Sequence, residues 1–237
     1  MGKNGSRLVS FRQYRFVDLL VFMLIMIVFE MINFFAANEW FEDEADFAIT
    51  VTLLITLLVT VRWNWLAIIF PIVDGAVYCA LMSYSGWYYL IYCVGNIFPV
   101  LTALLFIKVP QNKVFGKWYF TVMYVLLGYI LIVFGRTCMA AIVGVQFVYA
   151  LRSFSLRGLF DLIFTMVGFL ILRNIDGMVE NQKAYLFRKK REAEEMRRRD
   201  EFGEDPIEID EETLAILKKD SNSEGLNKRS EDLFKKD

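Results

Sequence analysis

The stretch that decides the fold runs from Arg12 to Asp46 and reads RQYRFVDLLVFMLIMIVFEMINFFAANEWFEDEAD. Its middle, residues 16–37, is an apolar run long enough for a helix to cross the hydrocarbon core of a bilayer, which takes about 20 residues. Basic residues precede this run and a cluster of acidic residues follows it. Since Lys and Arg collect on the cytoplasmic side of membrane proteins, the stretch predicts a transmembrane helix whose amino terminus is cytoplasmic.

Similar apolar runs follow along the chain. Apolar residues make up 57% of the sequence, more than the roughly half that is usual in soluble domains, and they concentrate before Arg173. Basic residues return on alternate joints, at Arg62, Lys108, Lys113 and Lys117. We therefore expect an all-α, multi-pass protein of the cell membrane with both termini in the cytoplasm and six transmembrane helices, at residues 16–37, 47–61, 66–82, 87–107, 118–141 and 157–173.

Two joints between these helices have distinct features. Asn64, flanked by Trp63 and Trp65, predicts a tight turn at the cytoplasmic interface, where Trp is enriched. The segment 137–156 is ambiguous, because the predicted topology places Arg152 and Arg157 on the outer side, against the charge rule. Either this segment is a longer outer loop or the fifth helix ends early.

The composition changes sharply after the last apolar run. We expect a six-helix transmembrane domain at residues 1–175 and a charged cytoplasmic tail at 176–237. The tail begins with a basic segment, 183–191, suited to anionic lipid headgroups of the inner leaflet, and an acidic segment follows at 201–212. Helix formers predict a helix over 178–200 and a short one over 211–219, and the end of the chain, from residue 220, is expected to be disordered. The tail is either a solvated extension or a docking site for a partner.

Ionisable and amide side chains inside the apolar runs are the candidate functional residues. Charged groups in hydrocarbon are costly, so each one indicates a function or a partner. The rise of about 1.5 Å per residue along a helix gives an approximate depth for each of these polar side chains, and all of the residues named below then fall in the outer two thirds of the membrane. Several also share a helix face with a ring, as Asp74 does with Tyr78 at i,i+4. The predicted solute-binding residues are Glu30, Asn33, Asp74, Tyr78, Tyr89, Tyr92, Asn96, Arg136 and Asp161.

Two interpretations of this set remain open. Rings that stack on a planar solute, combined with a few directional polar groups, form a typical small-molecule pocket, here open to the outside. Alternatively, the polar groups hold helices together without a ligand, with Arg136 paired to Glu30 or to Asp161.

The sequence lacks the residues that several classes of catalytic and metal-binding site require. Histidine is absent, which excludes His-based triads and His metal ligands. The sequence shows no metal-ligand spacing and no Gly-rich phosphate loop, so the chain cannot use ATP through a P-loop. We therefore expect no catalytic residues, no cofactor, no metal and no nucleic-acid partner, and we do not expect an enzyme.

Four local segments carry a resemblance to a known family. They are Val61-Arg62-Trp63-Asn64-Trp65, Tyr92-Cys93-Val94-Gly95-Asn96, Gly135-Arg136 and residues 176–186, DGMVENQKAYL. With the predicted six helices at 16–173, they resemble the S components of energy-coupling factor transporters, in particular poorly characterised S-component-like membrane proteins of Gram-positive bacteria. S components capture vitamins and related micronutrients.

The resemblance implies a substrate-capture subunit that binds a small, vitamin-like solute from the outer side. Its partners would be a membrane coupling subunit and cytoplasmic ATPases that supply the energy. The first helix departs from the family, because it is bulky where an Ala-x-x-x-Ala docking surface is usual. An alternative is a non-transporting membrane scaffold of the cell-shape or cell-wall type, which recruits partners through the tail.

Overall fold

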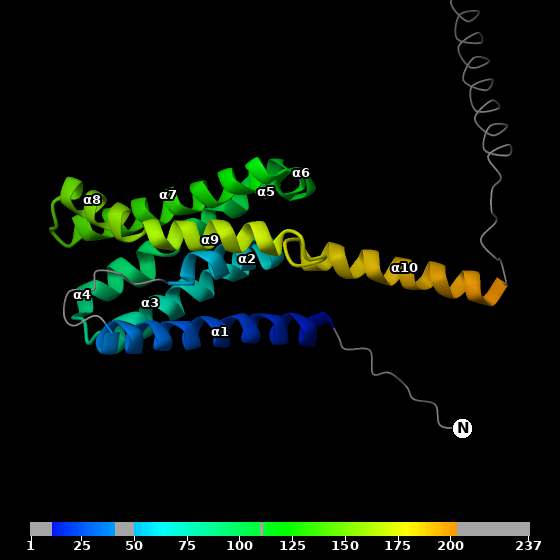
Figure 1. The fold of residues 1–237 in the computed structure, drawn as a ribbon, viewed down its shortest axis with the longest axis horizontal. Coiled ribbons are helices and arrows are strands. Elements are labelled where there is room, and N and C mark those ends of the chain that lie inside the picture. Colours follow the sequence, from blue (N-terminus) through cyan, green and yellow to red (C-terminus); the bar gives the residue numbers. More distant parts are fainter. Residues whose placement is uncertain (1–10, 41–49, 110, 203–237) are drawn as a thin grey trace, which may run out of the picture. The chain divides into compact units, whose positions relative to one another are not determined.

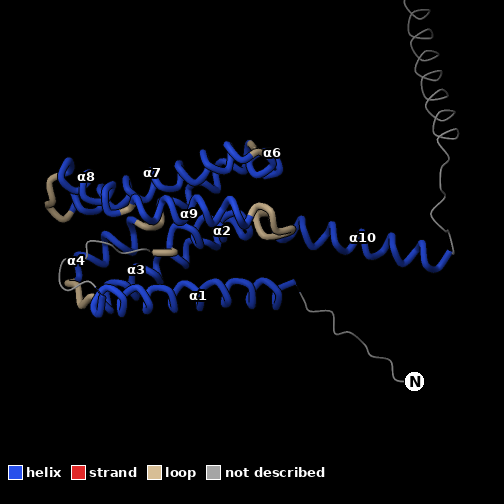
Figure 2. The backbone as a smooth tube through the Cα atoms, in the orientation of Figure 1, coloured by secondary structure: helices blue, strands red, loops and turns tan. Residues whose placement is uncertain are grey.

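A computed structural model describes residues 11–40, 50–109 and 111–202. These residues form helices and turns without a strand (Figure 2), which confirms the all-helical prediction. The helices are α1 (Phe11–Trp40), α2 (Thr52–Trp63), η1 (Asn64–Ile68), α3 (Ile69–Leu81), α4 (Gly86–Tyr89), η2 (Leu90–Val94), η3 (Phe98–Leu104), α5 (Leu105–Lys108), α6 (Gln111–Gly116), α7 (Trp118–Ile142), α8 (Phe147–Arg157), α9 (Leu159–Leu172) and α10 (Gln182–Phe202).

Length and composition identify the helices that can cross a membrane. Four helical stretches qualify among the described residues: 11–35, 52–81, 86–107 and 118–142. Helices α8 and α9, bent by 45° at their junction, qualify together as a fifth. The chain is therefore compatible with a multi-pass membrane protein.

The stretch from Thr52 to Leu81 is not one straight helix. The Thr52 hydroxyl donates a hydrogen bond of 2.6 Å to Asp74, yet these residues would lie about 33 Å apart on a continuous helix. The chain therefore reverses direction between α2 and α3. The reversal falls at Asn64, whose φ of 57° is in the left-handed region that Asn tolerates. A turn at this residue is what its neighbourhood in the sequence predicts.

Helix α2 is the central element of the fold. Every residue of α2 except Leu54 is buried, and the helix lies between α1 on one side and α7 and α9 on the other (Figure 1). A helix that is apolar on all sides is stable only when other elements surround it. Helix α1 is the opposite case, because many of its apolar side chains are exposed, including Phe16 and Ile32. This surface suits contact with lipid.

The packing around α2 is rich in aromatic residues. Tyr124 of α7 and Phe169 of α9 are both buried, with ring centroids 5.8 Å apart. The Tyr124 hydroxyl donates a hydrogen bond of 3.1 Å to the carbonyl oxygen of Leu57 and lies 3.2 Å from the Thr102 hydroxyl. The one polar atom of this ring is therefore satisfied, as a buried hydroxyl requires.

The ambiguous segment 137–156 is largely helical. Helix α7 continues to Ile142, a turn at Gly144 with φ of 95° follows, and α8 begins at Phe147. The last apolar helical stretch therefore starts at Phe147, ten residues before the predicted start at 157. The prediction missed α8 because Arg152 and the neighbouring serines lower its hydropathy. The long outer loop that the sequence allowed does not occur among these residues.

One compact unit of the chain reaches Leu186 and a second begins at Phe187, whereas the prediction placed the end of the transmembrane domain at 175. Residues 177–182 contribute buried side chains to the first unit, including Val179 and Gln182. The predicted tail helix at 178–200 corresponds to α10, which spans Gln182–Phe202. The acidic segment after residue 202, the short helix predicted at 211–219 and the end predicted to be disordered lie outside the described residues.

Candidate functional site

The amino terminus of α2 lies inside the bundle and gathers carboxylates from two other helices. Asp161 of α9 accepts hydrogen bonds from the Thr50 backbone N–H at 2.7 Å and from the Thr50 hydroxyl at 2.9 Å. Asp74 of α3 accepts the Thr52 hydroxyl at 2.6 Å. A helix amino terminus carries a partial positive charge of about half a unit, which favours such anions. The beginning of α2 therefore explains why two carboxylates are buried at this point.

A third carboxylate, Glu30 of α1, lies next to Asp74 and Thr52. Glu30 is 2% exposed and Asp74 3%. Thr52 has one hydroxyl proton, and the hydroxyl donates it in a hydrogen bond of 2.6 Å to Asp74 Oδ2. The other oxygen, Asp74 Oδ1, is buried and receives no hydrogen bond from any described residue. The two neighbouring carboxylates thus have fewer donors than they need.

A cation, Arg136 of α7, lies in this region. Its Nε donates a hydrogen bond of 2.6 Å to Asn96 Oδ1, and its guanidinium lies 5.3 Å from the centre of the Tyr92 ring. Glu30, Asp74 and Asp161 are close enough to Arg136 for its positive charge to act on their carboxyl groups. Even so, within the described part of the chain no nitrogen of Arg136 comes within 4.0 Å of a carboxylate oxygen.

Close helix packing holds Arg136 against Asn96. A Cβ atom on Gly135 would collide with the carbonyl oxygen of Gly95, and one on Gly95 would lie 2.9 Å from the Arg136 backbone. Gly75 plays the same part for α3, since its Cβ would lie 2.6 Å from the Tyr92 carbonyl carbon. Only glycine permits such approaches, so these glycines determine how near the charged groups of α3 and α7 come to the Tyr92 segment.

Tyrosine rings cover one side of this region. The ring centroids of Tyr78 and Tyr92 lie 4.8 Å apart, and those of Tyr84 and Tyr88 lie 4.6 Å apart with an interplanar angle of 22°. Tyr84 also stacks on Tyr92 at 6.3 Å. These spacings are those of favourable aromatic pairs. The rings form a continuous aromatic surface next to Arg136.

The structure brings most of the predicted binding residues into one neighbourhood. We call this set, together with Thr52, the outer cluster, after the side of the membrane that the sequence predicts for it: Glu30, Asp74, Tyr78, Tyr92, Asn96, Arg136 and Asp161. Asn33 and Tyr89 are half-buried, and neither has a hydrogen bond, ion pair or ring contact to this set in the described part of the chain. The predicted pairing of Arg136 with Glu30 or Asp161 is not made within 4.0 Å. Asp161 instead uses both of its oxygens on Thr50.

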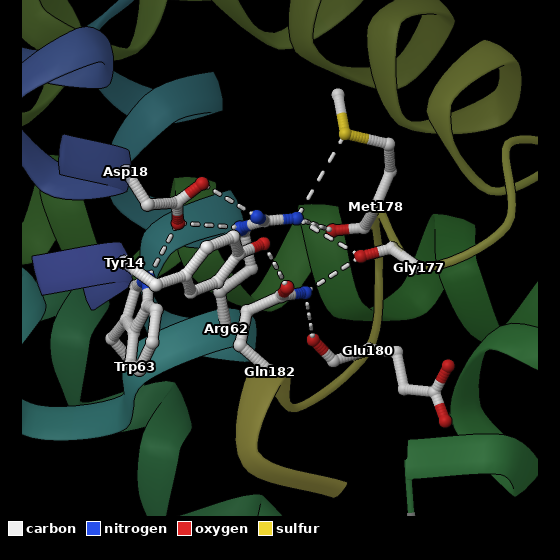
Figure 3. Close-up of polar contacts among 8 residues, drawn as sticks. All are labelled: Tyr14, Asp18, Arg62, Trp63, Gly177, Met178, Glu180 and Gln182. Carbon is white, nitrogen blue, oxygen red and sulfur yellow. Dashed lines mark hydrogen bonds and ion pairs between the residues drawn. The ribbon is translucent and has the colours of Figure 1, made fainter. Parts of the chain in front are cut away.

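A second polar site, which the sequence interpretation did not include, lies near the other end of α1. Asp18 forms an ion pair of 2.7 Å with Arg62 Nη2 and accepts further hydrogen bonds from Arg62 Nε at 3.0 Å and Trp63 Nε1 at 2.6 Å (Figure 3). Asp18 lies about 18 Å along α1 from Glu30. Asp18 is a carboxylate inside the first apolar run that the predicted set of polar residues left out.

Arg62 also binds the segment that follows α9. Its Nη1 donates to the carbonyl oxygens of Gly177 and Met178 at 2.9 and 3.1 Å, and its guanidinium lies 5.4 Å from the Phe22 ring centre. The Arg62 side chain is 5% exposed and that of Asp18 15%. Two of the segments that carry the family resemblance, 61–65 and 176–186, therefore meet at this guanidinium. We call this arrangement the inner junction.

Glutamine side chains complete the inner junction. Gln182, which is 1% exposed, accepts a hydrogen bond of 2.9 Å from the Tyr14 hydroxyl and donates to the carbonyls of Gly177 and Glu180 (Figure 3). Gln111 of α6 bridges the Val61 carbonyl and the Asn181 N–H at 2.9 and 2.8 Å. The residues after α9 are thus attached to α1, α2 and α6.

A sequence signal for the inner junction did exist. Asp18 is a carboxylate inside the first apolar run and Arg62 ends the second, and charges at these places need partners. The two were overlooked because each lies within a few residues of a run end, where charge is ordinarily solvated. No local pattern marks Gln111 or Gln182, since their bonds depend on chain reversals.

No protein-family model, curated protein or solved structure matches the chain. Among the described residues, no group of three or more His, Cys, Asp or Glu side chains is arranged to hold a metal ion.

Proposed function

We propose that this chain is a solute-binding membrane subunit of a micronutrient importer, of the S-component type, without chemistry of its own. The observation that carries the proposal is the outer cluster. It combines two adjacent carboxylates short of donors, a guanidinium that pairs with neither, and a surface of tyrosine rings. A helix-bonding function would favour direct pairing of these charges, because an unpaired charge in a low-dielectric interior is costly. A bound solute supplies the missing partners.

The proposed topology has six membrane passes with both termini in the cytoplasm. The reversal at Asn64 supports this count, because it divides the stretch 52–81 into two antiparallel arms. The bent pair α8 and α9 would form the last pass. The Arg62 junction would then lie on the cytoplasmic side and the outer cluster would lie toward the outside, in agreement with the Lys and Arg distribution.

Transport by such a subunit requires partners that provide energy. We propose a membrane coupling subunit and cytoplasmic ATPases for this role. The exposed apolar surface of α1 is available for a membrane partner as well as for lipid. The vitamin-like nature of the solute rests on the family resemblance alone.

The test is a binding assay on the full chain in lipid nanodiscs. Thermal unfolding is measured with panels of vitamins, nucleobases and amino acids, and any hit is confirmed by calorimetry. We expect at least one solute class to raise Tm in the wild type and to lose its effect in Arg136→Gln, whereas the exposed Arg152→Gln control keeps it. If no panel member changes Tm, the proposal fails.

A membrane scaffold is the second candidate, favoured by α10. This helix has 21 residues, most of them exposed, and its charged side chains pair along the surface, as Lys190 and Glu194 do at 3.8 Å. Removal of residues 203–237 separates the two functions. Solute uptake by the full chain that survives the truncation supports a transporter, whereas loss of cell-shape or cell-wall phenotype rescue on truncation, in a chain that takes up no solute, supports a scaffold.

A further inference from the structure

The outer cluster carries an imbalance of charge that points to the chemistry of its ligand. Three carboxyl groups, on Glu30, Asp74 and Asp161, are buried, and the charge of Arg136 acts on all three. The charge of Arg157 acts on Tyr92 of the same cluster. The amino terminus of α2 adds a partial charge of only about +0.5. Buried carboxyl groups in this number are stabilised either by protonation or by positive charge close to them.

The carboxyl groups that lack hydrogen-bond donors are those of Glu30 and Asp74 rather than that of Asp161. Both oxygens of Asp161 accept hydrogen bonds from Thr50. The single Thr52 hydroxyl proton is donated to Asp74 Oδ2, and Asp74 Oδ1 is buried and receives no hydrogen bond from any described residue. An ionised carboxylate only accepts hydrogen bonds, and a protonated carboxyl supplies a single O–H to its neighbour. A cationic donor with more than one N–H would satisfy both side chains at once.

Arg136 cannot be that donor in its observed position. Its Nε is held by Asn96 at 2.6 Å, and its guanidinium is placed over the Tyr92 ring. Gly135 and Gly95 fix the α7 backbone at this point. The two Nη atoms donate to none of the described residues, and a guanidinium group binds an anionic group well.

On the basis of the proposed solute-binding function, we propose that the ligand is a zwitterion of the amino-acid type. Its ammonium group would lie against Glu30 and Asp74, and its carboxylate would accept hydrogen bonds from the Nη atoms of Arg136. An ammonium has three donors, which suits the two donor-poor carboxylates. The tyrosine surface of Tyr78 and Tyr92 would contact the side chain of the ligand.

The experiment compares three matched probe pools with the full chain in nanodiscs. The first is a mixture of the common L-amino acids, the second holds the amines formally obtained by removing their carboxyl groups, and the third holds the acids formally obtained by removing their amino groups. We expect the amino-acid pool to raise Tm, the amine pool to do so less, and the deaminated acids to have no effect. A shift from the deaminated pool equal to that of the amino acids would overturn the inference.

Variants locate the two ends of the ligand. Asp74→Asn and Glu30→Gln are each expected to weaken amino-acid binding roughly tenfold or more, which is the effect of losing one charged hydrogen bond. Arg136→Gln should reduce the advantage of amino acids over amines. Glu194→Gln on α10 is the exposed control. Wild-type binding by both carboxylate variants would overturn the placement, and the wild-type pool comparison still decides the ligand class if a variant does not fold.

The outcomes separate this inference from the proposed function. If vitamins or nucleobases bind and amino acids do not, the solute-binding function stands and the zwitterion assignment is wrong. If no panel or pool changes Tm, both fail.

Discussion

Replacing Asp18 by Ala tests whether the inner junction stabilises the fold. The substitution removes the acceptor for Arg62 Nε, Arg62 Nη2 and Trp63 Nε1, which lie 3.0, 2.7 and 2.6 Å from its carboxylate oxygens. Arg62 keeps its bonds to the Gly177 and Met178 carbonyl oxygens, its weak contact with the Met178 sulfur and its contact with the Phe22 ring, and its buried charge loses the Asp18 counter-ion.

The expected cost follows from the burial of the pair. Breaking a buried ion pair by removing one partner costs about 3–5 kcal/mol. The Asp18 side chain is 15% exposed and that of Arg62 5%, so the lower end of that range applies. For a chain of this size, about 3 kcal/mol corresponds to a fall in Tm of roughly 6–12 °C.

The assay is thermal unfolding of the full chain in detergent, followed by a double-mutant cycle. Asp18→Ala and Arg62→Ala are each expected to lower Tm, and the double variant should lose much less than the sum, because the two residues share one interaction. Glu194→Gln, an exposed carboxylate on α10, is the control and should leave Tm unchanged. Additive losses in the double variant, or an unchanged Tm for Asp18→Ala, would refute the reasoning.

Three further substitutions test the packing and bonding around α2. Gly135→Ala forces a Cβ atom into a neighbouring carbonyl oxygen and should lower the free energy of unfolding by about 1–3 kcal/mol, while Gly116→Ala, which meets no atom within 4 Å, should leave it unchanged in denaturant titration. Tyr124→Phe removes a buried hydroxyl that donates to an α2 carbonyl at 3.1 Å and should cost about 1–2 kcal/mol, whereas Tyr149→Phe, on a ring that is 68% exposed, should cost nothing. Thr52→Val deprives the neighbouring α3 carboxylate of its hydroxyl donor and should lower Tm more than Thr52→Ser, which keeps the donor; equal Tm values would contradict that bond.

Many residues of the candidate site can be found from the sequence, by locating the polar residues within the apolar runs. Asp74, Asn96 and Arg136 are polar residues within apolar runs, and such residues must face protein rather than lipid. That requirement alone places them inside the bundle. It does not reveal which of them meet, and the expected ion pair between Arg136 and Glu30 or Asp161 is replaced by a bond from Arg136 to Asn96.

The sequence by itself determined the helical class, the apolar runs and the turn at Asn64, because these depend on local length, hydropathy and backbone preference. Only the tertiary structure decided that α2 is enclosed on all sides and that its first turn draws in Asp74 and Asp161. It also decided that Arg62 binds a segment more than a hundred residues away. These contacts form between helices that are far apart in the sequence. Hydropathy and helix propensity summed over one segment do not tell which residues of another helix will pack against it.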